Sequence, residues 1–399
     1  MSAPSRLRVL LLSRNYPNSV FPRLGLWVQW LARHLGGECD VTVIAPVPWW
    51  PPLPGPEEYS RFRKVEPSRR DGSVEVLHPR FLAGPGYLFH STEAVRYDLA
   101  IRRLTARIHR ERRFDLVHAQ FGYPDGVVAA RLSRRLGIPA IVTEHAFQHP
   151  WLDDYPLVRR QTLGAQGGLA AHIAVSDAVR RQIVSFMGPR HDVRVIPVGV
   201  DPETFFPRAH PDSGPPRVLY VGYRTRAKGV DVLIEAAARL ARKDPEIRFL
   251  LVGDDGYRDK RIQADRMRAR AAELGLSDRI TFAPGKPPQE VAGLLRESSI
   301  LVLPSRRETF GAVLVEALAS GTPVVATRCG GPEEIVTRET GVLVPPEDPE
   351  ALARGIEEVL RNRGSFDPAA LARYAVGRFS WDRVAKETIA VYREALTKR

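Results

Sequence analysis

A chain of 399 residues, 44% hydrophobic and 26% charged, has the composition of a soluble globular enzyme and is long enough for two domains. Its two cysteines, Cys39 and Cys329, lie too far apart for a disulfide framework or a zinc motif, and no apolar run is long enough to span a membrane. The formal net charge of +13 reflects either a bias toward arginine or attraction to anionic lipid, phosphorylated ligands or nucleic acid. Nucleic acid is the poorest candidate because no recognition motif is present. The low cysteine content fits a reducing compartment, so we expect a cytoplasmic protein.

The first half of the chain alternates short apolar runs with helical patterns. The predicted strands are Leu7–Leu12, Val41–Ala45, Asp115–Ala119, Ala140–Glu144, His172–Val175 and Arg194–Pro197, and the predicted helices include Leu24–Leu35 and Asp125–Leu136. Near-continuous apolar strands that alternate with helices are typical of a parallel sheet covered on both faces. The sequence therefore predicts a doubly wound α/β domain.

Two segments of this half stand apart from the alternation of strands and helices. Pro46–Tyr59 contains six prolines, which predict an irregular loop. Trp49 and Trp50 in this loop either fold back onto the body of the domain or meet an acceptor or a membrane, because tryptophan favours the lipid–water interface. The predicted helix Glu93–Arg112 is rich in arginine, which indicates either a solvated face or a surface for anionic headgroups.

A proline-rich break separates the two halves. Asp201–Pro216 contains five prolines and predicts an interdomain linker. The predicted strands after it are Val218–Gly222, Arg248–Gly253, Ile280–Ala283, Ile300–Pro304, Val324–Thr327 and Gly341–Val344, and the predicted helices are Lys228–Arg242, Lys260–Leu274, Pro287–Glu297 and Trp381–Lys398. The sequence thus predicts two doubly wound, Rossmann-like domains that face each other across a cleft. Ligands of such sheets bind at the carboxyl ends of the strands.

The most informative stretch of the chain places two carboxylates, Glu308 and Glu316, on either side of a predicted helix start. Pro304 ends a strand just before it, Gly311 lies at the helix N-terminus, and Gly321 follows the helix. A helix N-terminus with free backbone N–H groups binds anions, and carboxylates accept hydrogen bonds from hydroxyls. The pattern predicts a sugar-nucleotide site. The alternative is a pair of surface charges.

A second group of residues supplies positive charge after the strand Val218–Gly222. Arg224, Arg226 and Lys228 follow this strand at its carboxyl end and precede a helix. Arginine holds phosphate oxygens bidentately and lysine holds them as a point charge, so the segment predicts a diphosphate site. The alternative is that Lys228 merely opens the helix.

Two histidines and one glycine mark possible sites in the first half. His145 ends the strand Ala140–Glu144 and His118 ends the preceding strand, where either ring could bond a sugar hydroxyl or phosphate or serve only the structure. Gly25 opens a helix after the loop that follows the first strand, and its backbone could approach a phosphate. The loop has no GxGxxG and the chain has no GxxxxGK[ST], which argues against a dinucleotide fold and a P-loop. No histidine cluster indicates a metal.

These motifs together resemble the retaining family-4 (group 1) glycosyltransferases of the GT-B fold, over nearly the whole chain. They are Asp115–Ala119, Thr143–His145, Ile196–Asp201, Val221–Gly229, Leu251–Gly256, Glu308–Glu316 and Gly330–Ile335. The resemblance implies an N-terminal acceptor-binding domain, residues 1–200 with a returning helix in 379–399, and a C-terminal nucleotide-sugar-binding domain, residues 201–378. It implies neither a metal nor a cofactor.

The resemblance also assigns roles on the donor side. Glu316 would bind the ribose hydroxyls and Glu308 the hexose hydroxyls of a nucleotide sugar, while the Lys228 side chain would hold the diphosphate. Backbone amides near the helix start would share that diphosphate: Phe310, Gly311, Ala312 and Val313.

The remaining implied roles concern the transferred sugar and an arginine. His145 would contact the transferred sugar near the reaction centre, and Gly25 would line the phosphate pocket. The family often places an arginine directly after the residue that corresponds to Gly222, but this chain has Tyr223 there. Arg224 is the preferred substitute, with Arg226 as the alternative.

The expected activity is transfer of a hexosyl unit, with retention, from a nucleoside-diphosphate sugar to a glycan or lipid-linked acceptor in surface polysaccharide or glycolipid synthesis. An anionic membrane surface is a further expected partner. The alternatives are a sugar-nucleotide epimerase or phosphorylase on the same architecture, and a non-catalytic sugar-phosphate binding module.

Overall fold

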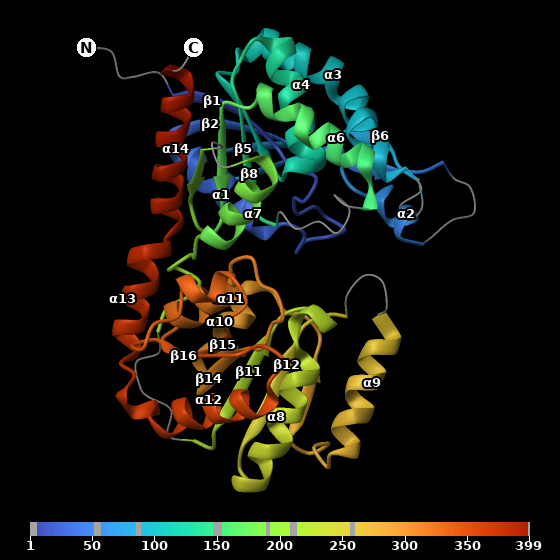
Figure 1. Ribbon diagram of the computed structural model, residues 1–399. Helices are drawn as coiled ribbons and strands as arrows, with labels where there is room; N and C mark the ends of the chain where they lie inside the picture. Colours follow the sequence, from blue (N-terminus) through green and yellow to red (C-terminus); the bar gives the residue numbers. More distant parts are fainter. Residues whose placement is uncertain are drawn as a thin grey trace. The chain divides into compact units, whose positions relative to one another are not determined.

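The computed structural model describes residues 6–51, 57–84, 89–146, 154–188, 192–207, 214–255 and 260–397. The chain divides into two compact units. Unit 1 joins Met1–Gly199 to Trp381–Arg399, and unit 2 is Val200–Ser380. Each unit is an α/β structure built on a mainly parallel sheet (Figure 1).

Unit 1 contains a sheet in the order β10-β9-β8-β7-β1-β2-β5-β4, in which only β4 runs antiparallel to its neighbour among the strands described. Its strands are β1 (Leu7–Leu12), β2 (Cys39–Ile44), β4 (Ser68–Asp71), β5 (Val74–Leu77), β7 (Leu116–Gln120), β8 (Ala140–Glu144), β9 (Ala171–Ala174) and β10 (Val193–Val195). Its helices are α1 (Leu26–Glu38), α2 (Glu57–Phe62), α3 (Glu93–Arg112), α4 (Val127–Leu136), α6 (Pro156–Ala165), α7 (Asp177–Met187) and α14 (Trp381–Thr397).

Unit 2 contains a parallel sheet in the order β13-β12-β11-β14-β15-β16. Its strands are β11 (Arg217–Val221), β12 (Arg248–Val252), β13 (Ile280–Ala283), β14 (Ile300–Leu303), β15 (Val324–Thr327) and β16 (Gly341–Val344). Its helices are α8 (Val230–Lys243), α9 (Lys260–Glu273), α10 (Pro288–Arg296), α11 (Ala312–Ala319), α12 (Pro349–Arg361) and α13 (Pro368–Phe379). Helices α8 and α12 pack against each other, as do α10 and α11 (Figure 1).

The elements predicted from hydrophobic periodicity are confirmed to within about three residues at each end, as is usual for element boundaries. Polar side chains fix several helix starts. Ser176 accepts a hydrogen bond from the Val179 amide at the start of α7, and Asp348 does the same for the first turn of α12. Lys398 of the predicted last helix and residues 208–213 of the predicted linker lie outside the described residues.

The prediction that Pro46–Tyr59 is irregular was wrong for part of that segment. Val47–Trp49 forms β3, which runs parallel to β6 (Arg80–Leu82), and α2 begins at Glu57. Proline is tolerated because the neighbours of Pro48 make the ladder bonds: the Val47 amide donates to Pro79 and the Trp49 carbonyl accepts from Ala83. Strands β4, β5 and β6 were also missed.

Helix α14 completes the core of unit 1 although it comes from the end of the sequence. It packs on α1 (Figure 1), and its buried residues join those of α1, β1 and β2 in one apolar cluster. Trp381 lies against Gly199, where a Cβ would come 2.3 Å from the indole ring. Any side chain at position 199 would therefore displace Trp381.

The strand orders place a topological switch point in each sheet. In unit 2 the chain leaves β11 toward β12 and β13, whereas it leaves β14 toward β15 and β16 in the opposite direction. In unit 1 the same reversal occurs between β1 and β7. Ligands of open α/β sheets bind outside the carboxyl ends of the strands at such points. The loops after β11 and β14, and after β1 and β7, are therefore the first places to search.

Candidate functional site

The switch point of unit 2 brings together two of the predicted site residues. Lys228 ends a short 3-10 turn after β11, and Glu308 lies in the loop after the neighbouring strand β14. Lys228 Nζ donates to Glu308 Oε2 at 2.5 Å, and Ser305 Oγ donates to the same oxygen at 3.2 Å. The Glu308 side chain is largely buried and that of Lys228 is partly exposed. This ion pair is the centre of the candidate site.

Close backbone approach holds the Lys228 loop against the Glu308 loop. Gly229 has a positive φ of 65°, and a Cβ there would lie 1.9 Å from the Pro304 carbonyl oxygen. The Arg306 amide donates to the Ala227 carbonyl at 2.8 Å across the same contact. Only glycine fits position 229, because any other residue would force the two loops apart.

Helix α11 begins at this site. Gly311, with a φ of 96°, precedes the first helical residue, Ala312. The amides of the first helical turn have no acceptor within the helix, and the first turn of α11 carries no acidic side chain that would occupy them. Phe310 is buried against Phe379 of α13, with ring centroids 5.8 Å apart. The Leu314 amide donates to the Gly311 carbonyl at 2.8 Å, and the helix presents the N–H groups of Ala312 and Val313 from a fixed position.

Glu316 lies in the second turn of α11. Its side chain is partly buried, and burial raises the pKa of its carboxyl to about 7. Within the part of the chain that the structure describes, this carboxyl makes no hydrogen bond or ion pair. A partly buried carboxyl without a partner has its acceptor oxygens available to a ligand.

Arg224 is buried rather than extended toward a ligand. Its Nε donates to Asp255 Oδ1 and its Nη1 to the Ala283 carbonyl, both at 2.8 Å. Arg224 and Glu308 both act on the phenol of Tyr220. Burial and the charge of Glu308 raise the pKa of Tyr220, whereas the charge of Arg224 lowers it. Arg226 lines a separate hollow of about 260 Å³ between α8 and α9.

The other predicted site residues, Gly25 and His145, lie in unit 1. Gly25 has a φ of 67°, and a Cβ there would lie 2.1 Å from the Asn15 carbonyl oxygen, so the loop after β1 needs glycine to fold back on itself. His145 follows β8, and its ring lies 5.8 Å from Trp27 in the first turn of α1 and 5.1 Å from Phe121. Gly25 and His145 thus border the same part of unit 1.

His145 is neutral at neutral pH because burial lowers its pKa to about 3. Its Nε2 lies 2.8 Å from Gln120 Oε1. Sequence reasoning missed Gln120, although a polar residue that ends an otherwise apolar strand at the carboxyl edge is a usable signal. His118 is fully buried and bonds Tyr392 of α14, so its side chain has a structural environment and does not reach a ligand.

Two buried carboxyls lie at the carboxyl edge of the sheet: Glu144 is the last residue of β8, and Asp125 lies in the turn after β7. Asp125 accepts from the Arg14 amide at 3.0 Å, and Glu144 lies against Gly122. Burial raises the pKa of each carboxyl to about 8, so ionisation of both is disfavoured in this part of unit 1.

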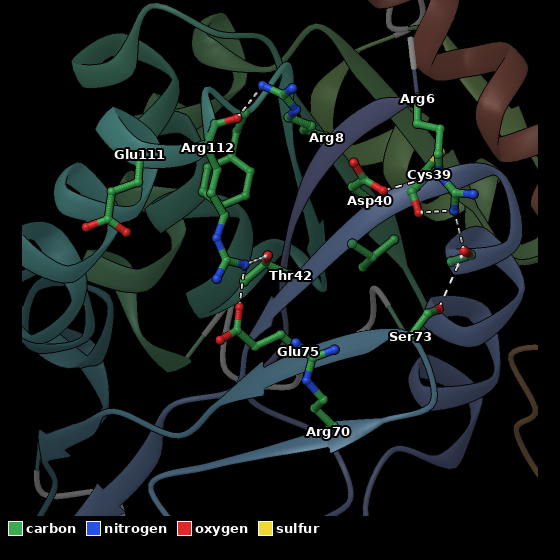
Figure 2. Close-up of a pocket in the computed structure, with 13 residues that line it drawn as sticks. Arg6, Arg8, Cys39, Asp40, Thr42, Arg70, Ser73, Glu75, Glu111 and Arg112 are labelled. Carbon is green, nitrogen blue, oxygen red and sulfur yellow. Dashed lines mark hydrogen bonds and ion pairs between the residues drawn. The ribbon is translucent and has the colours of Figure 1, made fainter. Parts of the chain in front are cut away.

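A hollow of about 430 Å³ in unit 1 is a different feature (Figure 2). It lies by the first residues of β1 and β2, at the end of the sheet opposite to Gly25 and His145. Three of its arginines bond the protein itself: Arg6 donates to the Gly36 and Cys39 carbonyls, Arg8 to the Arg112 carbonyl, and Arg112 to Thr42. Ligands of such sheets bind at the carboxyl ends, so the hollow is not part of the candidate site.

Within the described residues, no group of three or more histidine, cysteine, aspartate and glutamate side chains is arranged to hold a metal ion. Among the same residues, no helix is long and apolar enough to cross a membrane.

Comparison with known families agrees with this geometry. Residues 201–376 match the model of the group 1 glycosyl transferases, and residues 26–204 match that of glycosyltransferase family 4. The chain belongs to the group 1 glycosyltransferases.

Individual relatives support the same family, and solved structures support the fold. D-inositol 3-phosphate glycosyltransferase of Acidothermus cellulolyticus is 35% identical over 315 residues, which cover 72% of this chain and 68% of that protein. The protein of that name from Frankia alni is 33% identical over 315 residues, covering 72% of this chain and 76% of that protein. Sucrose-phosphate synthase from Thermosynechococcus elongatus has a TM-score of 0.80 at 22% identity and covers 99% of this chain and 100% of its own. HepE from Anabaena in complex with UDP has a TM-score of 0.74 at 18% identity, with 97% and 100% covered. The fold is that of the GT-B glycosyltransferases.

Proposed function

We propose that this chain is a retaining glycosyltransferase that moves a hexosyl unit from a nucleoside-diphosphate sugar to a glycan or lipid-linked acceptor, in surface polysaccharide or glycolipid synthesis. The observation that carries the proposal is the Lys228–Glu308 pair beside the free N-terminus of α11, at the switch point of unit 2. A cation and helix N–H groups suit a diphosphate, and a neighbouring carboxylate suits sugar hydroxyls.

In this proposal each residue acts on one part of the donor. Lys228 and the amides of Gly311, Ala312 and Val313 hold the diphosphate. Glu308 gives up its ion pair with Lys228 and accepts hydrogen bonds from the hexose, while Glu316 accepts them from the ribose. The ion pair therefore holds both side chains in place until a donor, with its larger negative charge, replaces Glu308 as the partner of Lys228.

The proposed chemistry follows the charge that develops. As the bond from the sugar to the diphosphate breaks, positive charge builds on the sugar and negative charge on the leaving group. Lys228 and the α11 amides stabilise the leaving group, which lowers the barrier because these groups are already in place. The acceptor hydroxyl attacks from the face that the diphosphate leaves, and a diphosphate oxygen takes its proton. The scheme routes no step through a protein nucleophile, a metal or a cofactor.

Relatives guide the choice of substrates to test. HepE was solved with UDP, with UDP and glucose, and with UDP-glucose, which supports a UDP-hexose as the first donor to try. The relatives named D-inositol 3-phosphate glycosyltransferase support a phosphorylated cyclitol among the acceptors to try. In this proposal Arg224, held by Asp255, adds positive charge behind the donor, His145 contacts the transferred sugar, and Gly25 lines its phosphate pocket.

A thermal-shift screen of nucleoside-diphosphate sugars tests the donor assignment. A ligand at about 100 times its Kd stabilises the folded state by about 2.7 kcal/mol, which for a chain of this size raises Tm by several degrees. We expect one donor and its nucleoside diphosphate to produce this shift, and the free hexose to produce none. Incubation of that donor alone checks for epimerised donor, and adding acceptors checks for transfer. A screen in which no nucleotide sugar shifts Tm contradicts the proposal.

A membrane surface is the proposed location of a lipid-linked acceptor. The outer face of α3 begins with exposed Val95 and Leu99 and continues with exposed Arg102 and Arg103. Trp49 and Leu82, paired across β3 and β6, are also exposed, and β6 packs on α3. Apolar side chains next to arginines suit the interface of an anionic bilayer.

Liposome binding tests this surface directly. Each arginine near an anionic membrane contributes about 1 kcal/mol, so reversing Arg102 and Arg103 to glutamate is expected to weaken binding to phosphatidylserine vesicles by about 30-fold or more. The control is the same charge change at Arg354 and Arg361 on α12, which should leave binding unchanged. Co-sedimentation at low and high salt measures the effect. Equal binding by both double variants would remove this surface from the proposal.

A further inference from the structure

A row of buried polar side chains lies in the interior of unit 1 and ends at His145. Its members are His118, Gln120, Thr143 and Tyr392. His118 and Gln120 lie two residues apart on β7, so both point to the same face of the sheet, and Thr143 lies on the neighbouring strand β8. Tyr392 reaches the row from α14. All four are fully or almost fully buried, in a region where polar groups must bond one another.

The row is continuous from α14 to His145. Tyr392 Oη lies 2.6 Å from His118 Nδ1, and His118 Nε2 lies 2.8 Å from Thr143 Oγ1 and 3.1 Å from Gln120 Nε2. At its other end the Gln120 amide oxygen lies 2.8 Å from His145 Nε2. Three hydrogen bonds thus connect a tyrosine of the last helix to His145.

The hydrogen-bonding role of each side chain in this row determines which ring nitrogen of its neighbouring histidine carries the proton. Burial lowers the pKa of His118 to about 3, as it does for His145, so each ring is neutral and carries one N–H and one lone pair. The Gln120 oxygen accepts from His145 Nε2–H, and the Gln120 amide N–H donates to His118 Nε2. His118 must then carry its proton on Nδ1, which donates to Tyr392 Oη.

We propose that Gln120, His118 and Tyr392 are positioning residues that hold His145 as its Nε2–H tautomer and leave the Nδ1 lone pair to accept a hydrogen bond from a hydroxyl of the transferred sugar. The part about the sugar rests on the function proposed above. The tautomer itself depends only on the hydrogen bonds inside unit 1. A neutral histidine in the other tautomer would present an N–H at the same place and could not accept that bond.

The row also couples distant positions. Without the Tyr392 hydroxyl, His118 Nδ1–H would have no acceptor among these side chains, and a buried donor without a partner is costly. The row regains its bonds if His118 moves its proton to Nε2, from which the Thr143 hydroxyl oxygen can accept. The Gln120 amide must then turn over, because its N–H would otherwise face the new N–H of His118. The amide N–H then donates to His145 Nε2, which forces the proton of His145 to Nδ1. A change on α14 therefore reverses the tautomer three hydrogen bonds away.

Nitrogen NMR of the full-length protein labelled with 15N-histidine tests the tautomer, with His145 assigned by the signal lost in His145→Asn. We expect Nε2–H in the wild type, predominantly Nδ1–H in Tyr392→Phe, and a mixture of both in Gln120→Met. An Nδ1–H form in the wild type, or an unchanged tautomer in both Tyr392→Phe and Gln120→Met, overturns the proposal.

Kinetics test the consequence for the reaction. Loss of an orienting partner costs about 10- to 100-fold, so Tyr392→Phe and Gln120→Met should lower kcat by that factor with little change in the KM of the donor. Thr388→Val is the matched control, because Thr388 is equally buried on α14 but bonds only within its helix. If the tautomers behave as expected but no glycosyl transfer is found, the function fails and the positioning row stands. Unchanged kcat in both variants overturns its role in catalysis.

Discussion

Replacing Lys228 by methionine is expected to lower kcat/KM for glycosyl transfer by about 100- to 1,000-fold, the usual cost of removing one group that stabilises developing negative charge. Methionine keeps an unbranched side chain that is one atom shorter and removes the charge and the donors. The measurement is product formation at several donor concentrations, which separates kcat from KM. Lys243→Met is the control, since Lys243 is an exposed lysine of α8 and should retain wild-type rates.

Stability must be measured alongside this activity. Lys228→Met leaves the largely buried Glu308 carboxylate without its cation, and a buried charge without a partner destabilises by several kcal/mol at most. The double variant Lys228→Met with Glu308→Gln removes that charge, so we expect its Tm to recover while its activity remains low. Wild-type kcat/KM in the folded single variant would contradict the assignment of Lys228 to the leaving group.

Replacing Glu316 by glutamine is expected to lower kcat/KM by about 100-fold and, at the same time, to stabilise the protein. The activity falls because hydrogen bonds to a charged acceptor contribute about 1.5–3 kcal/mol each, and the proposed ribose contact uses the carboxylate. The stability rises because burial raises the pKa of the Glu316 carboxyl from 4.5 to about 7, which means that the folded state resists its ionisation.

The gain in stability expected for Glu316→Gln depends on pH and increases as pH rises. Between pH 4.5 and about 7 the folded protein keeps a proton on Glu316 that the unfolded chain has released, so the stability of the wild type falls as pH rises through this window. Glutamine has no proton to lose and avoids this fall. The advantage of Glu316→Gln should be small at pH 5 and reach about 1–3 kcal/mol above pH 7.

Urea unfolding at pH 5 and pH 8 measures this difference, and thermal shift with the donor measures the loss of binding. The control is Glu350→Gln, because Glu350 is an exposed residue in the first turn of α12. A Glu316→Gln protein that is less stable than the wild type at pH 8, or one that transfers sugar normally, would show that Glu316 serves the fold rather than the ligand.

The site residues that could be predicted from the sequence are those marked by a pattern in the neighbouring residues. Lys228, Glu308 and Gly311 each lie at the boundary of a strand or helix that hydrophobic periodicity reveals, and a parallel sheet places such boundaries at one edge. Tyr392 has no such signature. Its partner His118 is 274 positions away, and only packing of α14 on unit 1 brings the two together.

The structure differs from the sequence-based predictions in three further places, each for a physical reason that depends on the folded structure. The strand Ser68–Asp71 was missed because it is polar and lies at the edge of its sheet, so it lacks the apolar run of a buried strand. The strand Val47–Trp49 was hidden by Pro48, which an edge pairing tolerates. The guanidinium of Arg224 was expected at a ligand, and its use by Asp255 depends on β11 and β12 being neighbours.

The origin of α14 has a consequence for how the protein is made. Residues 7–195 contain every described strand of the unit 1 sheet, yet the apolar face of that sheet is completed by Trp381, Ile389 and Tyr392. During synthesis, all residues of unit 2 are made before α14 is. Until then the apolar face of the unit 1 sheet that α14 covers stays exposed. Partly folded domains with such surface are prone to aggregate. A chain that stops near residue 380 should therefore contain a folded unit 2 and an aggregation-prone unit 1.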